Sequence, residues 1–209
     1  MVNTAFLFGD PIAVVHSTET GAFLAELPPP LRLAVVYAPA RVRGAWAALL
    51  LLDHRLSRAV AGASEPLLAQ VKLAWWRDRM RTPASQWPQG EPLLAALARF
   101  NGERTALEAL VDAWEGLIGG ETGATGMDRL AEARAGAVAA LARLSDCPTN
   151  ADAIEVLVRR WTVPDAAQAE TVRLPRTLRP LAILANLPRS SDAGPLAMLR
   201  IVRLGLFGR

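Results

Sequence analysis

Residues 31–80 read LRLAVVYAPARVRGAWAALLLLDHRLSRAVAGASEPLLAQVKLAWWRDRM, and this segment gives the clearest indication of a helical fold. We expect a first helix over Leu31–Tyr37 and a second from Pro39 to Val60, because proline is tolerated in the first turn of a helix. The first half of the second helix is apolar on nearly every side, which predicts a central, buried helix. Ser64-Glu65-Pro66 has the residue types of a helix start, so a third helix should follow it.

The rest of the chain extends this pattern into a single all-α domain. The 209 residues are 52% hydrophobic, with one tyrosine and five phenylalanines, so strong β-formers are scarce. We expect one helical domain over residues 1–209, with residues 1–30 as a loosely ordered lead-in that ends in three prolines. Periodicity and helix-stop signals predict six further helices. They are Pro92–Phe100, Glu103–Ile118, Met127–Leu144, Asp152–Trp161, Leu181–Leu187 and Leu196–Phe207.

Charge and composition exclude several kinds of partner. The net charge is +3, but the basic residues are scattered and form no stripe with interleaved aromatics, so we expect no nucleic-acid partner. One cysteine and two histidines argue against a disulfide framework and an ordinary zinc site.

The N-terminus lacks the positive region of a signal peptide, which predicts a cytoplasmic protein. Arginines among the leucines of Leu196–Phe207 suggest a peripheral position at the inner face of the membrane.

Three phrases carry a family resemblance: Tyr37-Ala38-Pro39-Ala40-Arg41-Val42-Arg43, Leu52-Asp53-His54-Arg55-Leu56, and Ser64-Glu65-Pro66 followed by Leu73-Ala74-Trp75-Trp76-Arg77-Asp78. In this order and spacing they resemble the squalene/phytoene synthase family. Arg173-Leu174-Pro175 continues the resemblance more faintly. It implies a helical bundle of the isoprenoid synthase type. It also implies chemistry in which magnesium, held by two Asp-x-x-x-Asp clusters, assists the departure of pyrophosphate from a prenyl diphosphate.

Neither aspartate cluster is present. The first should follow Leu56, where the chain reads Ser57-Arg58-Ala59-Val60-Ala61 without a carboxylate. The second should fall within residues 150–174, which hold only four acidic residues in no such pair. They are Asp152, Glu155, Asp165 and Glu170. The sequence therefore predicts no catalytic residue, no metal ligand and no cofactor, with magnesium expected only if the protein is an active prenyl transferase.

The remaining polar residues have plainer interpretations. Asp53 is expected to be a surface or buried hydrogen-bonding aspartate, and Trp75 and Trp76 point to different sides, so at most one need be core. Two acidic groups, Glu108/Asp112/Glu115 and Asp128/Glu132, are expected to form salt-bridged faces with Arg104 and Arg129. Arg41 and Arg77 are the candidates for binding the anionic end of a ligand.

Three functions remain open. The leading hypothesis is a non-catalytic family member that binds an isoprenoid or lipid, or assists assembly of a membrane-associated protein complex, as a complex I assembly factor does. The resemblance to that branch rests on Leu73-Ala74-Trp75-Trp76-Arg77. The first alternative is an active prenyl transferase in carotenoid or hopanoid synthesis. The second is a plain helical interaction module.

Overall fold

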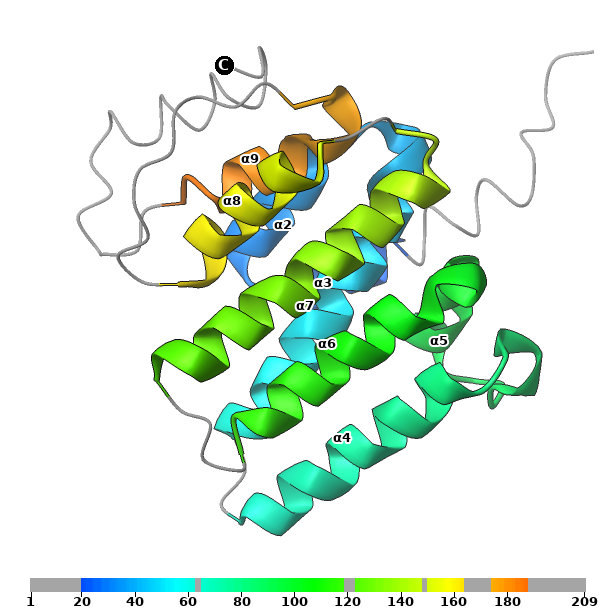
Figure 1. The fold of residues 1–209 in the computed structure, drawn as a ribbon. Coiled ribbons are helices and arrows are strands. Elements are labelled where there is room, and N and C mark those ends of the chain that lie inside the picture. Colours follow the sequence, from blue (N-terminus) through cyan, green and yellow to red (C-terminus); the bar gives the residue numbers. More distant parts are fainter. Residues whose placement is uncertain (1–19, 63–64, 119–122, 148–149, 164–173, 188–209) are drawn as a thin grey trace, which may run out of the picture.

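The computed structural model describes residues 20–62, 65–118, 123–147, 150–163 and 174–187, and this part of the chain is helical without strands. The all-helical prediction is therefore confirmed. Figure 1 shows the helices gathered into one bundle. The α-helices are α2 (Pro29–Val36), α3 (Ala40–Ala61), α4 (Pro66–Arg81), α5 (Pro92–Leu97), α6 (Arg104–Gly116), α7 (Ala124–Leu144), α8 (Ala151–Thr162) and α9 (Arg179–Leu184). Three 3-10 helices add to them: η1 (Ala84–Gln86), η2 (Ala98–Glu103) and η3 (Arg176–Leu178).

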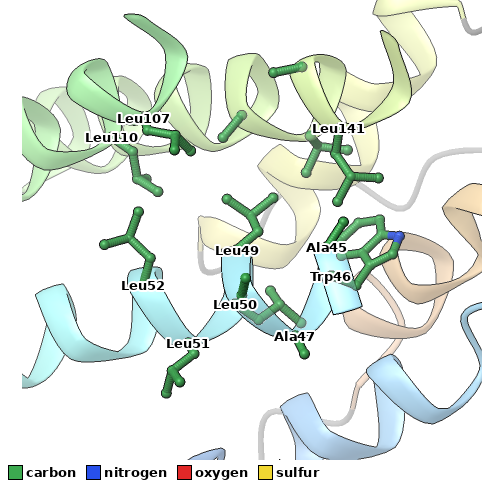
Figure 2. Packing of buried hydrophobic residues seen from close by; sticks show 14 of the residues in the cluster. Ala45, Trp46, Ala47, Leu49, Leu50, Leu51, Leu52, Leu107, Leu110 and Leu141 are labelled. Atoms are coloured by element: carbon green, nitrogen blue, oxygen red, sulfur yellow. The ribbon is translucent and has the colours of Figure 1, made fainter. Parts of the chain in front are cut away.

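Helix α3 is the centre of the core. It contacts α2, α4, α5, α6 and α7, and its residues from Ala45 to Asp53 are all buried. In Figure 2, Leu49 and Leu52 point toward the side of α6 and α7, while Leu51 points the opposite way. Because apolar side chains leave this helix in every direction, neighbours can pack around it on all sides. The prediction of a buried central helix is confirmed.

Proline and glycine fix both ends of α3 and the start of α4. Pro39 lies immediately before α3 with an extended ψ of 145°, and Pro66 occupies the first turn of α4. Gly62 ends α3, and its N–H donates to the carbonyl of Arg58 at 2.9 Å. A proline needs no intrahelical partner at these positions, so the sequence could place the boundaries well.

The C-terminal part of the described chain is attached to α3 through Trp46. This side chain is fully buried, and its indole Nε1 donates to the carbonyl of Thr177 in η3 at 2.8 Å. Helix α9 follows η3 directly and packs on α2 and α8. The bond satisfies a polar group that would otherwise be buried without a partner.

The lead-in prediction is wrong for residues 20–30. Residues 20–26 are helical, and Phe23 and Leu27 are buried at 4% and 1% exposure. Their apolar side chains join the main core, which explains why this segment is ordered. Residues 1–19 and the helix expected over Leu196–Phe207 lie outside the described residues.

The segment expected to be one helix over Pro92–Phe100 is divided. Helix α5 ends at Leu97, and η2 continues from Ala98 to Glu103 before α6 begins. Leu93 and Leu97 of α5 and Phe100 of η2 are all buried. The apolar spacing that suggested one continuous helix therefore directs side chains into the core from both the α-helix and the 3-10 helix.

Among the described residues, no helix combines the length and apolar character needed to cross a bilayer.

Replacing a core leucine of α3 should be costly. Leu51→Ala should lower the free energy of unfolding by about 2–5 kcal/mol, because it leaves a cavity among packed side chains. Leu51 is 0% exposed, whereas Leu67 is 65% exposed and provides the matched control. Leu67→Ala should change stability by less than about 0.5 kcal/mol in urea unfolding. Equal losses for both variants would contradict the central position of α3.

Candidate functional site

The last turn of α3 occupies the place where the first aspartate cluster was expected. Its side chains offer no carboxylate: the Ser57 hydroxyl donates to the carbonyl of His54 at 2.8 Å, and Arg58 is exposed. A guanidinium repels a divalent cation and cannot ligate it. This turn is therefore unsuited to holding magnesium.

Asp53 lies one turn earlier and is buried, with 4% of its surface exposed. Two helices supply its partners. Trp114 of α6 donates its indole N–H to Oδ1 at 2.8 Å. Arg134 of α7 donates from Nε to Oδ1 at 3.1 Å and from Nη2 to Oδ2 at 2.8 Å. This fork-to-fork pairing satisfies both carboxylate oxygens and agrees with the interpretation of Asp53 as a hydrogen-bonding aspartate.

The Arg134 guanidinium has further partners besides the Asp53 carboxylate. Its Nη1 donates to the hydroxyl of Thr162 at 3.2 Å. The guanidinium carbon also lies 4.3 Å from the centre of the Trp161 ring and 5.3 Å from that of Trp114. Both aromatic faces attract a cation, and the side chain is only 12% exposed. We call Asp53, Trp114, Arg134, Trp161 and Thr162 the arginine cluster.

The arginine cluster does not fit a magnesium ion. Magnesium needs a near-octahedral set of oxygen ligands, and Asp53 is the only carboxylate in the cluster. Both of its oxygens already accept hydrogen bonds, and a permanent positive charge lies 2.8 Å away. Among the described residues as a whole, no group of three or more His, Cys, Asp or Glu side chains could hold a metal ion.

The acidic face of α6 is paired with α4. Glu108 accepts from Arg81 at 2.6 Å, while Glu115 accepts from both terminal nitrogens of Arg77. Asp112 lies between them, 3.6 Å from Arg77. The expected salt-bridged face is present, but Arg104 does not supply it. Arg104 instead donates to Asn101 in the preceding turn.

Asp112 also borders a groove of about 510 Å³ between α6 and α7. Burial raises the pKa of its carboxyl, and the nearby Arg77 opposes that shift only in part. Small side chains line the groove, and charges stand beside them. Its lining comprises Ala106, Ala109, Asp112, Ala113, Arg129, Glu132, Ala133 and Gly136.

The second expected acidic pair is divided. Glu132 lines this groove, whereas Asp128 accepts from Arg159 of α8 at 2.6 Å. The expectation of a salt bridge between Arg129 and Asp128 is therefore wrong. Asp128 of α7 instead forms its ion pair with Arg159 of α8, so the pair connects two helices and not two neighbours on one helix.

Arg41 and Arg77 contact different parts of the bundle. Arg41, in the first turn of α3, donates to the Thr177 hydroxyl at 3.0 Å and reaches the carbonyl of Ser145 at 3.5 Å. With Arg99 it lines a groove of about 310 Å³, whereas Arg77 is engaged by the acids of α6. The two arginines share neither a groove nor a partner, so they do not form one site.

The two tryptophans of α4 have different surroundings. Trp76 is buried at 8% exposure, and Trp75 is 39% exposed. Their rings meet edge to face with centroids 4.9 Å apart. The prediction that at most one of them need be core is confirmed.

The residues expected near a second aspartate cluster are only partly described. Asp152 and Glu155 lie exposed on α8, and Asn150 caps that helix by accepting from the N–H of Asp152 at 2.9 Å. Asp165 and Glu170 lie outside the described residues, as does Arg173. The described part of this region therefore presents no pair of carboxylates directed into the bundle.

Sequence reasoning missed Arg134 and its aromatic partners. Arg134 stands on an alanine-rich helix and is separated by 81 residues from Asp53. The only local signal is that a charged residue occurs among the small side chains of α7, on the helix face that also carries the buried Leu130 and Ala137. Such a position suggests a buried partner without identifying it.

Comparison with protein families gives a match to part of the chain. A family model described as squalene/phytoene synthase matches residues 31–132, from the first turn of α2 into α7. No curated protein and no solved structure matches the chain. The matched segment includes Asp53 and Trp114, and it ends two residues before Arg134.

Breaking the arginine cluster should destabilise the bundle. Arg134→Met leaves the Asp53 carboxylate buried without its cation, so the free energy of unfolding should fall by about 3–5 kcal/mol. The double variant Asp53→Leu/Arg134→Met should recover part of that loss, because it removes both charges while Trp114 loses an acceptor.

The exposed pair Glu103–Arg143 is the control for that measurement. Its arginine side chain is 58% exposed, so Glu103→Gln should cost no more than about 1 kcal/mol in the same urea titration. If Arg134→Met lowered the free energy of unfolding as little as Glu103→Gln does, the arginine cluster would not stabilise the packing of these helices.

The imidazole of His54 should make stability depend on pH. Burial lowers its pKa, and the nearby Arg58 lowers it further. The unfolded chain therefore binds a proton more readily than the native one, so this contribution to stability is present above about pH 6.5 and is lost as the pH falls below that. Urea unfolding at pH 7.5 and 5.5 should show a smaller difference for His54→Gln than for the wild type, and an equal difference would contradict this.

Proposed function

Because residues 31–132 belong to the squalene/phytoene synthase family, we propose that this protein is a non-catalytic member that acts as a binding or assembly protein. The observation that carries the proposal is the pairing of Asp53 with Arg134. In the family, carboxylates directed into the bundle hold metal ions that receive the departing pyrophosphate. Here the buried carboxylate of α3 is neutralised by the protein's own cation.

The other acidic residues support the same proposal. Glu108 and Glu115 of α6 are bound by arginines of α4, and Asp128 is bound by Arg159. Among the described residues no group of three or more acidic, histidine or cysteine side chains could hold a metal ion, so the charge on a departing diphosphate would lack the metal ions that offset it. Losing such stabilisation typically costs orders of magnitude in rate.

We propose that the ligand or partner is met at the surface of the bundle. The groove between α6 and α7 offers small apolar side chains for a prenyl or acyl chain, with Asp112 and Arg129 beside them. Of the two arginines expected to bind an anion, Arg41 is better suited, because it shares its groove with Arg99 while Arg77 is occupied by acids. A membrane-associated protein complex is the proposed partner, at the cytoplasmic face of the membrane.

The active prenyl transferase remains the second candidate because of one observation. Asp112 and Glu132 line the same groove, and partial burial raises the pKa of the Asp112 carboxyl. A relocated metal site would need both of these carboxylates as ligands.

The tight packing around α3 favours the third hypothesis, a plain helical interaction module.

Incubation with farnesyl or geranylgeranyl diphosphate and magnesium tests the proposal. The wild-type protein should release no more pyrophosphate than a sample without protein, because the described residues include no group of carboxylates that could hold the metal ions. Pyrophosphate release would be measured with a coupled enzymatic assay.

Two variants decide what any release means. Asp112→Ala removes the carboxyl of the groove, while Asp152→Ala removes an exposed carboxyl of α8 as the matched control. Turnover that persists in Asp152→Ala and disappears in Asp112→Ala would overturn the non-catalytic proposal and favour the relocated metal site.

A further inference from the structure

The outer face of α4 carries an exposed apolar stripe. Leu67, Val71 and Trp75 follow one another at intervals of four residues and are 65%, 61% and 39% exposed. Leu68 lies beside them and is 51% exposed. Four large apolar side chains in contact with water on one helix face are unusual for a surface and typical of an interaction site. We call these four residues the α4 stripe.

The position of α4 in the bundle explains why this face has no internal partner. The helix packs on α6 and α3 through its opposite side, where Ala69, Leu73, Trp76 and Met80 are buried. Figure 1 shows α4 at the edge of the bundle beside α6. Successive residues of a helix are 100° apart, so the α4 stripe lies opposite the buried side.

Cations border the α4 stripe. Lys72 is exposed on one flank, and the Arg79 guanidinium lies 5.9 Å from the centre of the Trp75 ring. Asp78 is the only acidic residue of the helix, against four basic ones. Two of these cations, Arg77 and Arg81, are neutralised by α6, which leaves Lys72 and Arg79 as the basic edge.

We propose that the α4 stripe docks on an anionic lipid bilayer, with its apolar side chains inserted at the headgroup level and Lys72 and Arg79 against lipid phosphates. An amphipathic helix lying in the interface needs such a combination of an apolar face and flanking cations. Tryptophan suits the border between the two regions, because its ring is apolar and its N–H polar. The proposal goes beyond the proposed function and does not depend on whether the protein is catalytic.

A bilayer fits this face better than a second copy of the chain. Pairing two copies of α4 about an axis near Val71 would bring Lys72 close to the same lysine of the partner copy, and like charges at close range are unfavourable. An anionic surface instead complements both cations at once.

Co-sedimentation with vesicles tests the proposal. The full chain should bind vesicles of phosphatidylcholine with phosphatidylglycerol and should bind pure phosphatidylcholine more weakly. Added salt should weaken the binding, because screening reduces the attraction between the cations and the lipid. No binding to the anionic vesicles, or equal binding to both kinds, would overturn the proposal.

A matched pair of triple variants assigns the binding to this face. Leu67→Gln/Val71→Gln/Trp75→Gln removes the row along α4, and Val36→Gln/Leu144→Gln/Val156→Gln removes three exposed apolar side chains from other helices. The first should bind anionic vesicles about tenfold more weakly or worse, and the second should bind like the wild type. Equal binding by both variants would overturn the proposal.

Two further measurements keep the test decisive. If the α4 variant does not fold by circular dichroism, Lys72→Glu alone should weaken binding to anionic vesicles severalfold, and unchanged binding would overturn the proposal. Size-exclusion chromatography of the wild type checks the other occupant. A dimer that the α4 variant converts to a monomer, together with no vesicle binding, would assign the face to a second copy of the chain.

Discussion

The interaction on which the bundle depends is the ion pair between Asp53 and Arg134. It connects α3 with α7, and through Trp114, Trp161 and Thr162 it reaches α6 and α8. Burying two charges is costly, and their attraction offsets that cost only when the geometry is good and the remaining hydrogen bonds are made. The arginine cluster meets both conditions, with a bidentate pairing and two aromatic faces. Four helices must therefore be in place together for either charge to be tolerated.

The same pairing lies partly within the segment that matches the family model. The squalene/phytoene synthase match covers α3 and α6, which supply Asp53 and Trp114. A family built on metal-holding carboxylates would leave an acidic side chain unpaired until the metal ion arrives. In this protein arginines take up that charge: Arg134 at Asp53, and Arg77 and Arg81 on the acids of α6. A guanidinium is permanently charged, so deprotonation of the arginine does not break these pairings at physiological pH.

Local rules of sequence explain what could be predicted and what could not. Pro39, Pro66 and the apolar run of α3 determine helix ends and burial within a few residues, so those predictions succeeded. The same reasoning paired Glu108 with Arg104, a neighbour on its own helix, whereas the actual partner is Arg81 of α4. Ion pairs between two helices depend on how those helices pack, and the spacing of residues along the sequence does not reveal that packing. Residues 20–30 were misjudged for a related reason, since their order depends on a core formed by distant segments.

Titration of the protein with Mn²⁺, a spectroscopic substitute for magnesium, tests the central claim most directly. The claim is that the buried Asp53 carboxylate is neutralised by Arg134 and holds no metal ion. Electron paramagnetic resonance in the presence of a non-reactive prenyl diphosphate analogue should find all the manganese free or bound only by the analogue. Stoichiometric binding of manganese to the protein, abolished by Asp53→Asn, would contradict the claim.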